Sequence, residues 1–104
     1  MSSSAMLRLI AMFACLAGLA ACGGAPVQEM SDARQAIAAA RVAGASERAP
    51  ADLDAAQAAI ARAETHLQAQ EYTRARIAAL EAKHRASVAL QNSERANGTA
   101  ETTH

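Results

Sequence analysis

Three histidines are the side chains of this 104-residue chain best suited to metal binding or acid–base catalysis. His66, His84 and His104 are far apart in the sequence, and a metal site needs three or four ligands at suitable spacing. The acidic residues are scattered, mostly beside arginines or at expected helix starts. The pattern contains no Ser-His-Asp arrangement and no glycine-rich phosphate loop. We therefore expect structural or solvated histidines, and no catalytic residue, metal, cofactor or small-molecule substrate.

The thiol of Cys22 is the one reactive group that follows a recognisable pattern. Arg8 and the apolar run 9–18 precede it and are typical of a secretory signal peptide. The segment 9–22 is too short for a membrane-spanning helix, which needs about 20 apolar residues. The signal starts at either Met1 or Met6. An ordinary signal peptide with an unrelated cysteine is the alternative interpretation.

The sequence Leu19-Ala20-Ala21-Cys22 resembles the lipobox of bacterial lipoproteins. The resemblance implies cleavage between Ala21 and Cys22 and a thioether-linked diacylglyceryl group on Cys22. It also implies a further acyl chain, such as palmitate, on the new amino group. In lipoprotein sorting, an Asp after the lipidated cysteine retains a protein in the inner membrane, and this chain has Gly23 instead. The resemblance thus implies a protein anchored in the cell outer membrane and facing the periplasm.

Composition indicates one small all-α domain after residue 21. Alanine dominates, Tyr72 is the only aromatic residue beyond the signal segment, and no β-branched or aromatic run suggests a strand. Lys and Arg together number 10, as do Asp and Glu, so no strong positive field favours nucleic acid. Because Cys15 is lost with the signal peptide and Cys22 carries lipid, we expect no disulfide.

Four segments are expected along the chain. They are a signal peptide (1–21), a lipidated flexible tether (22–30), an alanine-rich helical domain (31–97) and a disordered tail (98–104). Within the helical domain, Ser31 is a suitable N-cap for a short first helix, and Gly44 is a suitable residue to end it. A loop at 45–49 follows this helix.

Pro50 fits the first position of a second helix, which ends near Gln68. A turn at 69–70 leads to a third helix from 71 to about 95. The expected fold is all-α: a signal helix is followed by a short helix and a long antiparallel α-hairpin, in a three-helix, coiled-coil-like arrangement.

The two long helices carry apolar stripes that fit each other. In the hairpin, large residues of the second helix would face alanines of the third, with Ile60 against Ala79. The stripes are Leu53, Ala56, Ile60, Ala63 and Leu67 on the second helix and Tyr72, Ala75, Ala79, Ala82, Ala86 and Ala89 on the third. A rival register, with Ile77 near Ala63 and Leu80 near Ile60, stays open.

A second apolar strip on the third helix consists of Ile77, Leu80 and Val88 and lies away from the alanine stripe. Either the first helix covers this strip or a partner does. We expect an interaction surface here, for envelope proteins or for a second copy of the chain.

Three runs, at 36–45, 49–56 and 71–76, contain in order the patterns Ala-Gly-Ala, Ala-Pro-x-x-Leu and Glu-Tyr-x-x-Ala. In this order they resemble the domain-of-unknown-function 4398 family. That family occurs in small bacterial lipoproteins and ahead of OmpA-like peptidoglycan-binding domains. The resemblance covers roughly 30 to 92 and implies no catalytic residues.

The expected function is that of a lipid-anchored structural or interaction protein of the bacterial envelope, and not of an enzyme. The alternative is a binding module for periplasmic peptide or cell-wall glycan, which would use a groove between the first and third helices. The Glu-Tyr-x-x-Ala pattern also resembles half of a tetratricopeptide unit. Such arrays need at least three repeats to be stable, so we set this likeness aside.

Overall fold

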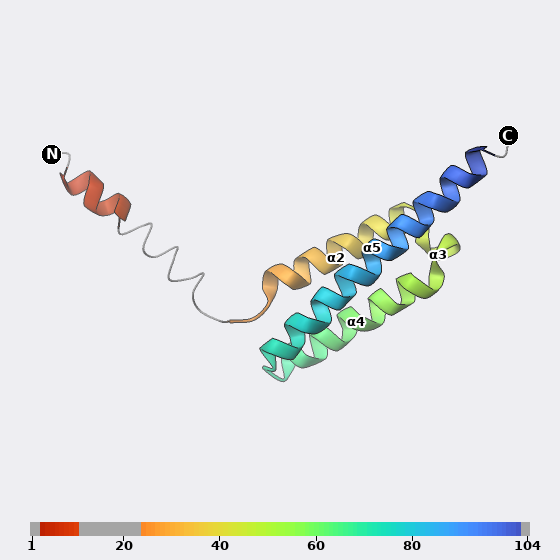
Figure 1. The fold of residues 1–104 in the computed structure, drawn as a ribbon. Helices are drawn as coiled ribbons and strands as arrows, with labels where there is room; N and C mark the ends of the chain where they lie inside the picture. Colours follow the sequence, from red (N-terminus) through yellow and green to blue (C-terminus); the bar gives the residue numbers. More distant parts are fainter. Residues whose placement is uncertain (1–2, 11–23, 103–104) are drawn as a thin grey trace.

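The computed structural model describes residues 3–10 and 24–102, with side chains as far as residue 98. From residue 24 onward it contains four helices: α2 (Val27–Val42), α3 (Ala45–Arg48), α4 (Pro50–Gln68) and α5 (Tyr72–Thr102) (Figure 1). Residues 3–10 are also helical, and the described residues include no strand. The predicted all-α class is therefore confirmed. The predicted cleavage and lipid site at Ala21 and Cys22 lies outside the described residues.

Helix α5 packs against both α2 and α4, which contact each other less. The core clusters give the directions of the helices: Ala63 of α4 meets Ala78 of α5, whereas Leu53 meets Ala89. Helices α4 and α5 are thus antiparallel. Ile37 of α2 packs at the Leu53 end, so α2 runs in the same direction as α5.

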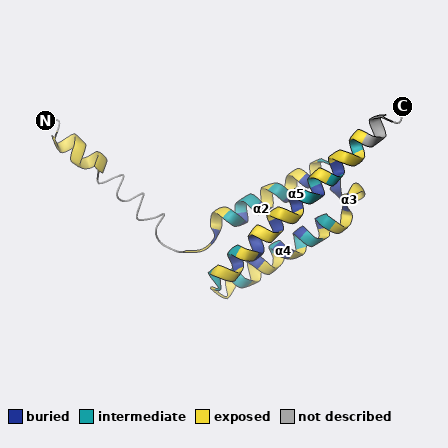
Figure 2. Ribbon diagram, in the orientation of Figure 1, coloured by how far each residue is buried: buried dark blue, intermediate teal, exposed yellow. Residues whose placement is uncertain are grey.

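A row of buried alanines on α5 forms the centre of this arrangement, visible as dark blue segments along the ribbon (Figure 2). The predicted stripe members Ala75, Ala79, Ala82, Ala86 and Ala89 are all fully buried. The row contacts α4 on one side and α2 on the other. The alanine face of α5 therefore packs against both neighbouring helices.

The buried face of α4 is rotated slightly relative to the predicted stripe. Leu53, Ala56 and Ala63 are buried as expected, but Ala59 is fully buried as well. Ile60 is only partly buried and packs at the edge of all three core clusters. The presence of α2 explains this shift, because the buried face of α4 must suit two helices rather than one.

Helix α2 begins at Val27, which corrects the predicted start at Ser31 and places part of the expected tether in the helix. The amide of Met30 donates to the carbonyl of Pro26 at 3.0 Å. Met30 is 2% exposed and packs against alanines of α4 and α5. Burial of this large side chain stabilises a first turn that has no side-chain cap. Ser31 lies inside the helix, where its hydroxyl accepts a hydrogen bond from Gln35.

The segment 45–49, expected to be a loop, contains the single helical turn α3. Gly44 ends α2 in the left-handed conformation, with φ 87°, as its predicted role requires. Ala45 and Ala49 are buried and join the cluster around Leu53. Pro50 is the first residue of α4, as predicted. The short helix forms because Ala45, together with Ala49 just after the helix, completes the core at this end.

The turn between α4 and α5 is a Schellman motif without glycine. Gln70 takes the left-handed position, with φ 60°, and its amide donates to the carbonyl of Leu67 at 3.0 Å. The amide of Glu71 donates to the carbonyl of His66 at 2.8 Å. The predicted turn at 69–70 is present, although its residues gave no glycine or proline signal.

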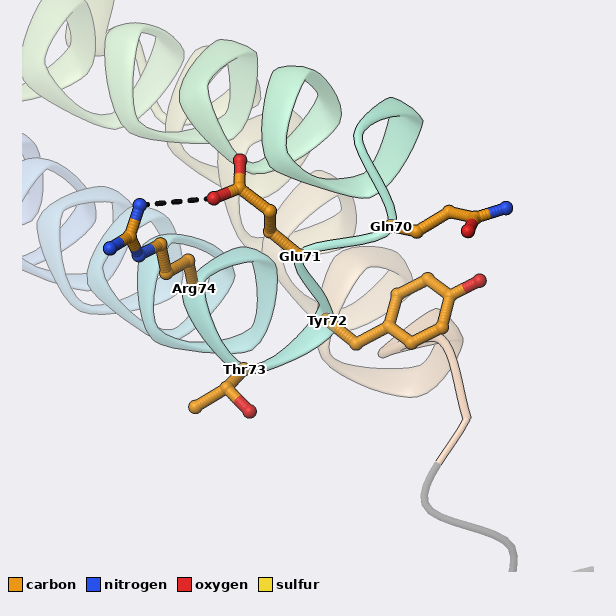
Figure 3. Close-up of a pocket in the computed structure, with 5 residues that line it drawn as sticks. All are labelled: Gln70, Glu71, Tyr72, Thr73 and Arg74. Atoms are coloured by element: carbon orange, nitrogen blue, oxygen red, sulfur yellow. Dashed lines mark hydrogen bonds and ion pairs between the residues drawn. The ribbon is translucent and has the colours of Figure 1, made fainter.

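Side chains also join across this turn. The carboxylate of Glu71 accepts a hydrogen bond from His66 Nδ1 at 3.2 Å. It also accepts one from Arg74 Nη1 at 3.0 Å (Figure 3). Because a carboxylate only accepts, His66 must carry its proton on Nδ1 here. The hydrogen bond from His66, followed by the nearby charge of Arg74, lowers the pKa of Glu71 below its ordinary value of 4.5. Tyr72, expected to be a core residue, is only partly buried.

Helix α5 continues to Thr102, past its predicted end near residue 95 and into the segment expected to be a disordered tail. It extends beyond the start of α4 (Figure 1). There the side-chain amide of Asn92 donates to the carboxylate of Asp52 at 2.9 Å. Ser93 continues the buried face, and its hydroxyl donates to the carbonyl of Ala89 at 2.7 Å. A small hydroxyl therefore takes an alanine position without leaving a buried polar group unsatisfied.

The alanine contacts predict the effect of adding volume to α4. Ala59→Leu should destabilise the domain by about 1–3 kcal/mol, because the new side chain would separate α4 from α2 and α5. Ala58→Leu is the matched control, since residue 58 is exposed, and it should change stability by less than about 0.5 kcal/mol. Urea unfolding followed by circular dichroism measures both. Equal losses would contradict this account of the core.

The contacts of Glu71 with His66 and Arg74 predict that stability depends on pH. The carboxylate of Glu71 is favoured in the folded state, so it contributes stability above its ordinary pKa of 4.5 and loses that contribution as the pH falls through its lowered pKa. A ¹³C NMR titration of the side-chain carboxyl should report the lowered pKa. His66→Ala should raise it more than Arg74→Ala does. The opposite order would assign the pKa shift to Arg74.

Candidate functional site

The structure does not bring the histidines together. His66 is bonded to Glu71 at the α4–α5 turn, whereas His84 is exposed on α5 and His104 lies outside the described residues. Among the residues from 3–10 and 24–102, no group of three His, Cys, Asp or Glu side chains is placed to hold a metal ion.

The strip predicted as an interaction surface lies on the outer side of α5, opposite the buried alanines. Ile77 is 62% exposed and Leu80 is 50% exposed, while Val88 is partly buried. His84 is exposed between them, and we call these four residues the outer strip. Their spacing of three and four residues places them on one helical face.

Helix α2 does not cover the outer strip. Its buried residues pack instead beside the alanine row of α5 and are Met30, Ala33, Ile37 and Ala40. The sequence left open whether the first helix or a partner covers the strip. In the folded chain, Ile77 and Leu80 remain accessible.

One ion pair lies on each side of the outer strip. On the α4 side, Arg62 Nη2 is 3.1 Å from Glu81 Oε2. On the α2 side, Arg76 Nε is 3.1 Å from Glu29 Oε1. An apolar centre with a charged rim is the usual composition of a protein contact surface.

A groove lies between α2 and α4, whereas the groove expected from the sequence was placed between the first and third helices. Its volume is about 310 Å³, and its lining residues are Arg34, Ile37, Arg41, Gln57, Ile60 and Glu64. Arg34 Nη2 is 3.1 Å from Glu64 Oε1. The groove forms here because the alanines of α5 allow close contact with both neighbours, whereas larger side chains face each other between α2 and α4.

A second hollow of about 410 Å³ lies at the α4–α5 turn, lined by residues 70–74 (Figure 3). The start of α2 is at the same end, because Arg76 Nη2 donates to the carbonyl of Gly24 at 3.3 Å. Tyr72 and Thr73 project outward from the turn, whereas Arg74 turns back to Glu71. The sequence carries no signal for this hollow, because the hollow depends on the fold of the turn.

No helix within the described residues is both long and apolar enough to cross a bilayer.

Comparison with protein families matches the chain to a family described as a domain of unknown function, DUF4398. The match covers residues 28–103, which is most of the chain and nearly all of the described helical part. Comparison with curated proteins and with solved structures gives no match. The family resemblance drawn from the three alanine-rich runs is therefore confirmed, and the chain belongs to the DUF4398 family.

Proposed function

We propose that this chain is a lipid-anchored, non-catalytic protein of the bacterial envelope, held at the outer membrane, facing the periplasm and acting through helix contacts. The exposed pair Ile77 and Leu80 is the observation that carries the contact role. The Leu19-Ala20-Ala21-Cys22 sequence carries the anchor. Other envelope proteins or a second copy of the chain are the proposed partners.

The membrane anchor would compensate for the small size of the contact that the outer strip can make. Full burial of an Ile or Leu side chain is worth about 1.5–3 kcal/mol, and Ile77 and Leu80 are already partly covered. The contact is therefore too small for a stable complex between freely diffusing proteins. Attachment to one membrane raises the effective concentration of two partners, so a weak contact becomes sufficient.

Recognition of a periplasmic peptide or cell-wall glycan is the second candidate function. The groove between α2 and α4 favours it, because Arg41 and Gln57 place polar groups beside the apolar side chains of Ile37 and Ile60. Such lining suits a ligand with both polar and apolar parts. Saturable binding of a muropeptide by the monomeric protein would support this function, and Arg41→Ala should weaken it.

The outer strip predicts the effect of a charge at Leu80. Leu80→Glu should reduce the yield of partner crosslinks in the native envelope, because a carboxylate would have to be desolvated in the contact. Val42→Glu is the matched control, since Val42 is 91% exposed on α2, away from the strip. Crosslinked products are identified by mass spectrometry.

Circular dichroism must show that both Glu variants keep their helical content. If Leu80→Glu folds and every crosslinked partner survives at the wild-type yield, the outer strip is not the contact surface. If both variants lose partners equally, the effect of the charge is not specific to the strip.

The anchor predicts the behaviour of Cys22→Ser. This variant should incorporate no labelled palmitate, and it should either leave the membrane fraction or accumulate uncut. Cys15→Ser is the matched control, because residue 15 lies in the expected signal peptide and its loss should not affect lipidation. The wild type should fractionate with outer-membrane markers.

Two results would contradict the proposed anchor and location. Palmitate incorporation into Cys22→Ser would place the lipid elsewhere. Fractionation of the mature wild type with inner-membrane markers would contradict the location that Gly23 implies.

A further inference from the structure

We infer that the α4–α5 turn end of the domain rests on the headgroup surface of the membrane. This inference rests on the proposed lipid anchor at Cys22. It adds an orientation and a second contact with the bilayer, formed by residues at the turn hollow.

The first step is that the chain is fixed to the fold from Gly24 onward. The carbonyl of Gly24 accepts a hydrogen bond from Arg76 of α5, and Pro26 is fully buried. Arg76 also forms an ion pair with Glu29 in the first turn of α2. The segment before α2 is therefore held against the start of α5.

The second step is the short covalent distance from this fixed point to the lipid. Cys22 precedes Gly24 by two residues, and an extended chain spans at most about 7 Å over that length. An acylated Cys22 must lie at the bilayer surface. Gly24, and the fold around it, must then lie within about one headgroup thickness of that surface.

Gly24 lies near one particular end of the domain. Arg76 belongs to the beginning of α5, so Gly24 lies at the end that carries the α4–α5 turn (Figure 1). Helix α3 is at the opposite end of α4. A helix of 19 residues is about 28 Å long, so α3 lies about that far from the tethered end, and it is held away from the surface when the turn end faces the bilayer.

The fourth step is the chemistry of the turn end. Tyr72 and Thr73 project outward, and the side chain of Arg74 is 71% exposed (Figure 3). Tyrosine rings favour the membrane–water interface, and a guanidinium group donates to lipid phosphates. Glu71 is held by His66 and Arg74, so its negative charge is compensated. The turn end therefore suits a headgroup surface, without the cluster of basic residues that would make it depend on anionic lipid.

The test uses the lipidated full mature protein in phosphatidylcholine vesicles that contain a lipid with a nitroxide on its headgroup. Because Cys15 and Cys22 are the only cysteines, lipidation leaves no free thiol, and a single new cysteine can carry a fluorophore. Thr73→Cys places the label at the turn end. Ser46→Cys is the matched control in α3, since both residues are exposed and each is the second residue of its helix.

We expect a loss of fluorescence by nitroxide quenching at residue 73 and none at residue 46. Quenching at residue 73 should not change when anionic phosphatidylglycerol is added to the vesicles. A flexible Gly-Ser spacer between Gly23 and Gly24 should remove it. If Thr73→Cys does not fold by circular dichroism, Gln68→Cys replaces it, because Gln68 is exposed in the last turn of α4.

Mass spectrometry of the same samples separates the two proposals. If Cys22 is acylated but residues 73 and 46 are quenched equally, the orientation is wrong and the anchor stands. If quenching at residue 73 persists with the spacer, the side chains at the turn hold the contact by themselves, and the argument from the short tether is overturned. If Cys22 carries no lipid, the anchor itself is wrong and the orientation fails with it.

Discussion

Contact between alanine methyl groups is the interaction on which the rest of this structure depends. Because these side chains are short, α2 and α4 can both approach the same face of α5, where the alanines at 79, 82, 86 and 89 are fully buried. Each methyl group removes little apolar surface from water, so the core gains its stability from many close contacts rather than from a few large side chains. Met30, Ile37 and Leu53 are the larger buried residues, and they lie toward the two ends of the alanine row.

The use of one face of α5 for two neighbours leaves the opposite face uncovered. A helix packed on both sides would bury Ile77 and Leu80, but here they remain exposed between two ion pairs. Under the proposed anchoring, the turn end of the bundle is at the membrane and α5 rises from it. The outer strip would then face sideways, toward other proteins on the same membrane. The position of the anchor and the exposure of the strip are thus two parts of one functional proposal.

Periodicity and end signals predicted the elements whose structure is decided locally. Pro50 begins α4, Gly44 ends α2, and the alanine stripe of α5 is buried, all as the sequence indicates. The start of α2 could not be predicted, because it depends on the burial of Met30 against residues far along the chain. The groove between α2 and α4 could not be predicted for the same reason: periodicity shows which face of a helix is apolar, but not which neighbour covers it. The outer strip could be recognised as a second apolar face, whereas its exposure followed only from the position of α2.

A row of nearly identical methyl groups specifies the register of helices poorly, since a shift of one turn would bring one alanine to the place of another. The polar contacts between helices supply this specificity. Arg34 bonds Glu64 between α2 and α4, and Arg62 bonds Glu81 between α4 and α5. Arg76 joins α5 to Glu29 of α2, and Asn92 joins α5 to Asp52 of α4. Exposed ion pairs contribute little to the free energy of unfolding. A slip of one helical turn, about 5.4 Å, would nevertheless break all of these contacts across the slipped interface. The alanines therefore determine how closely the helices pack, and the charged residues at their edges determine which positions meet.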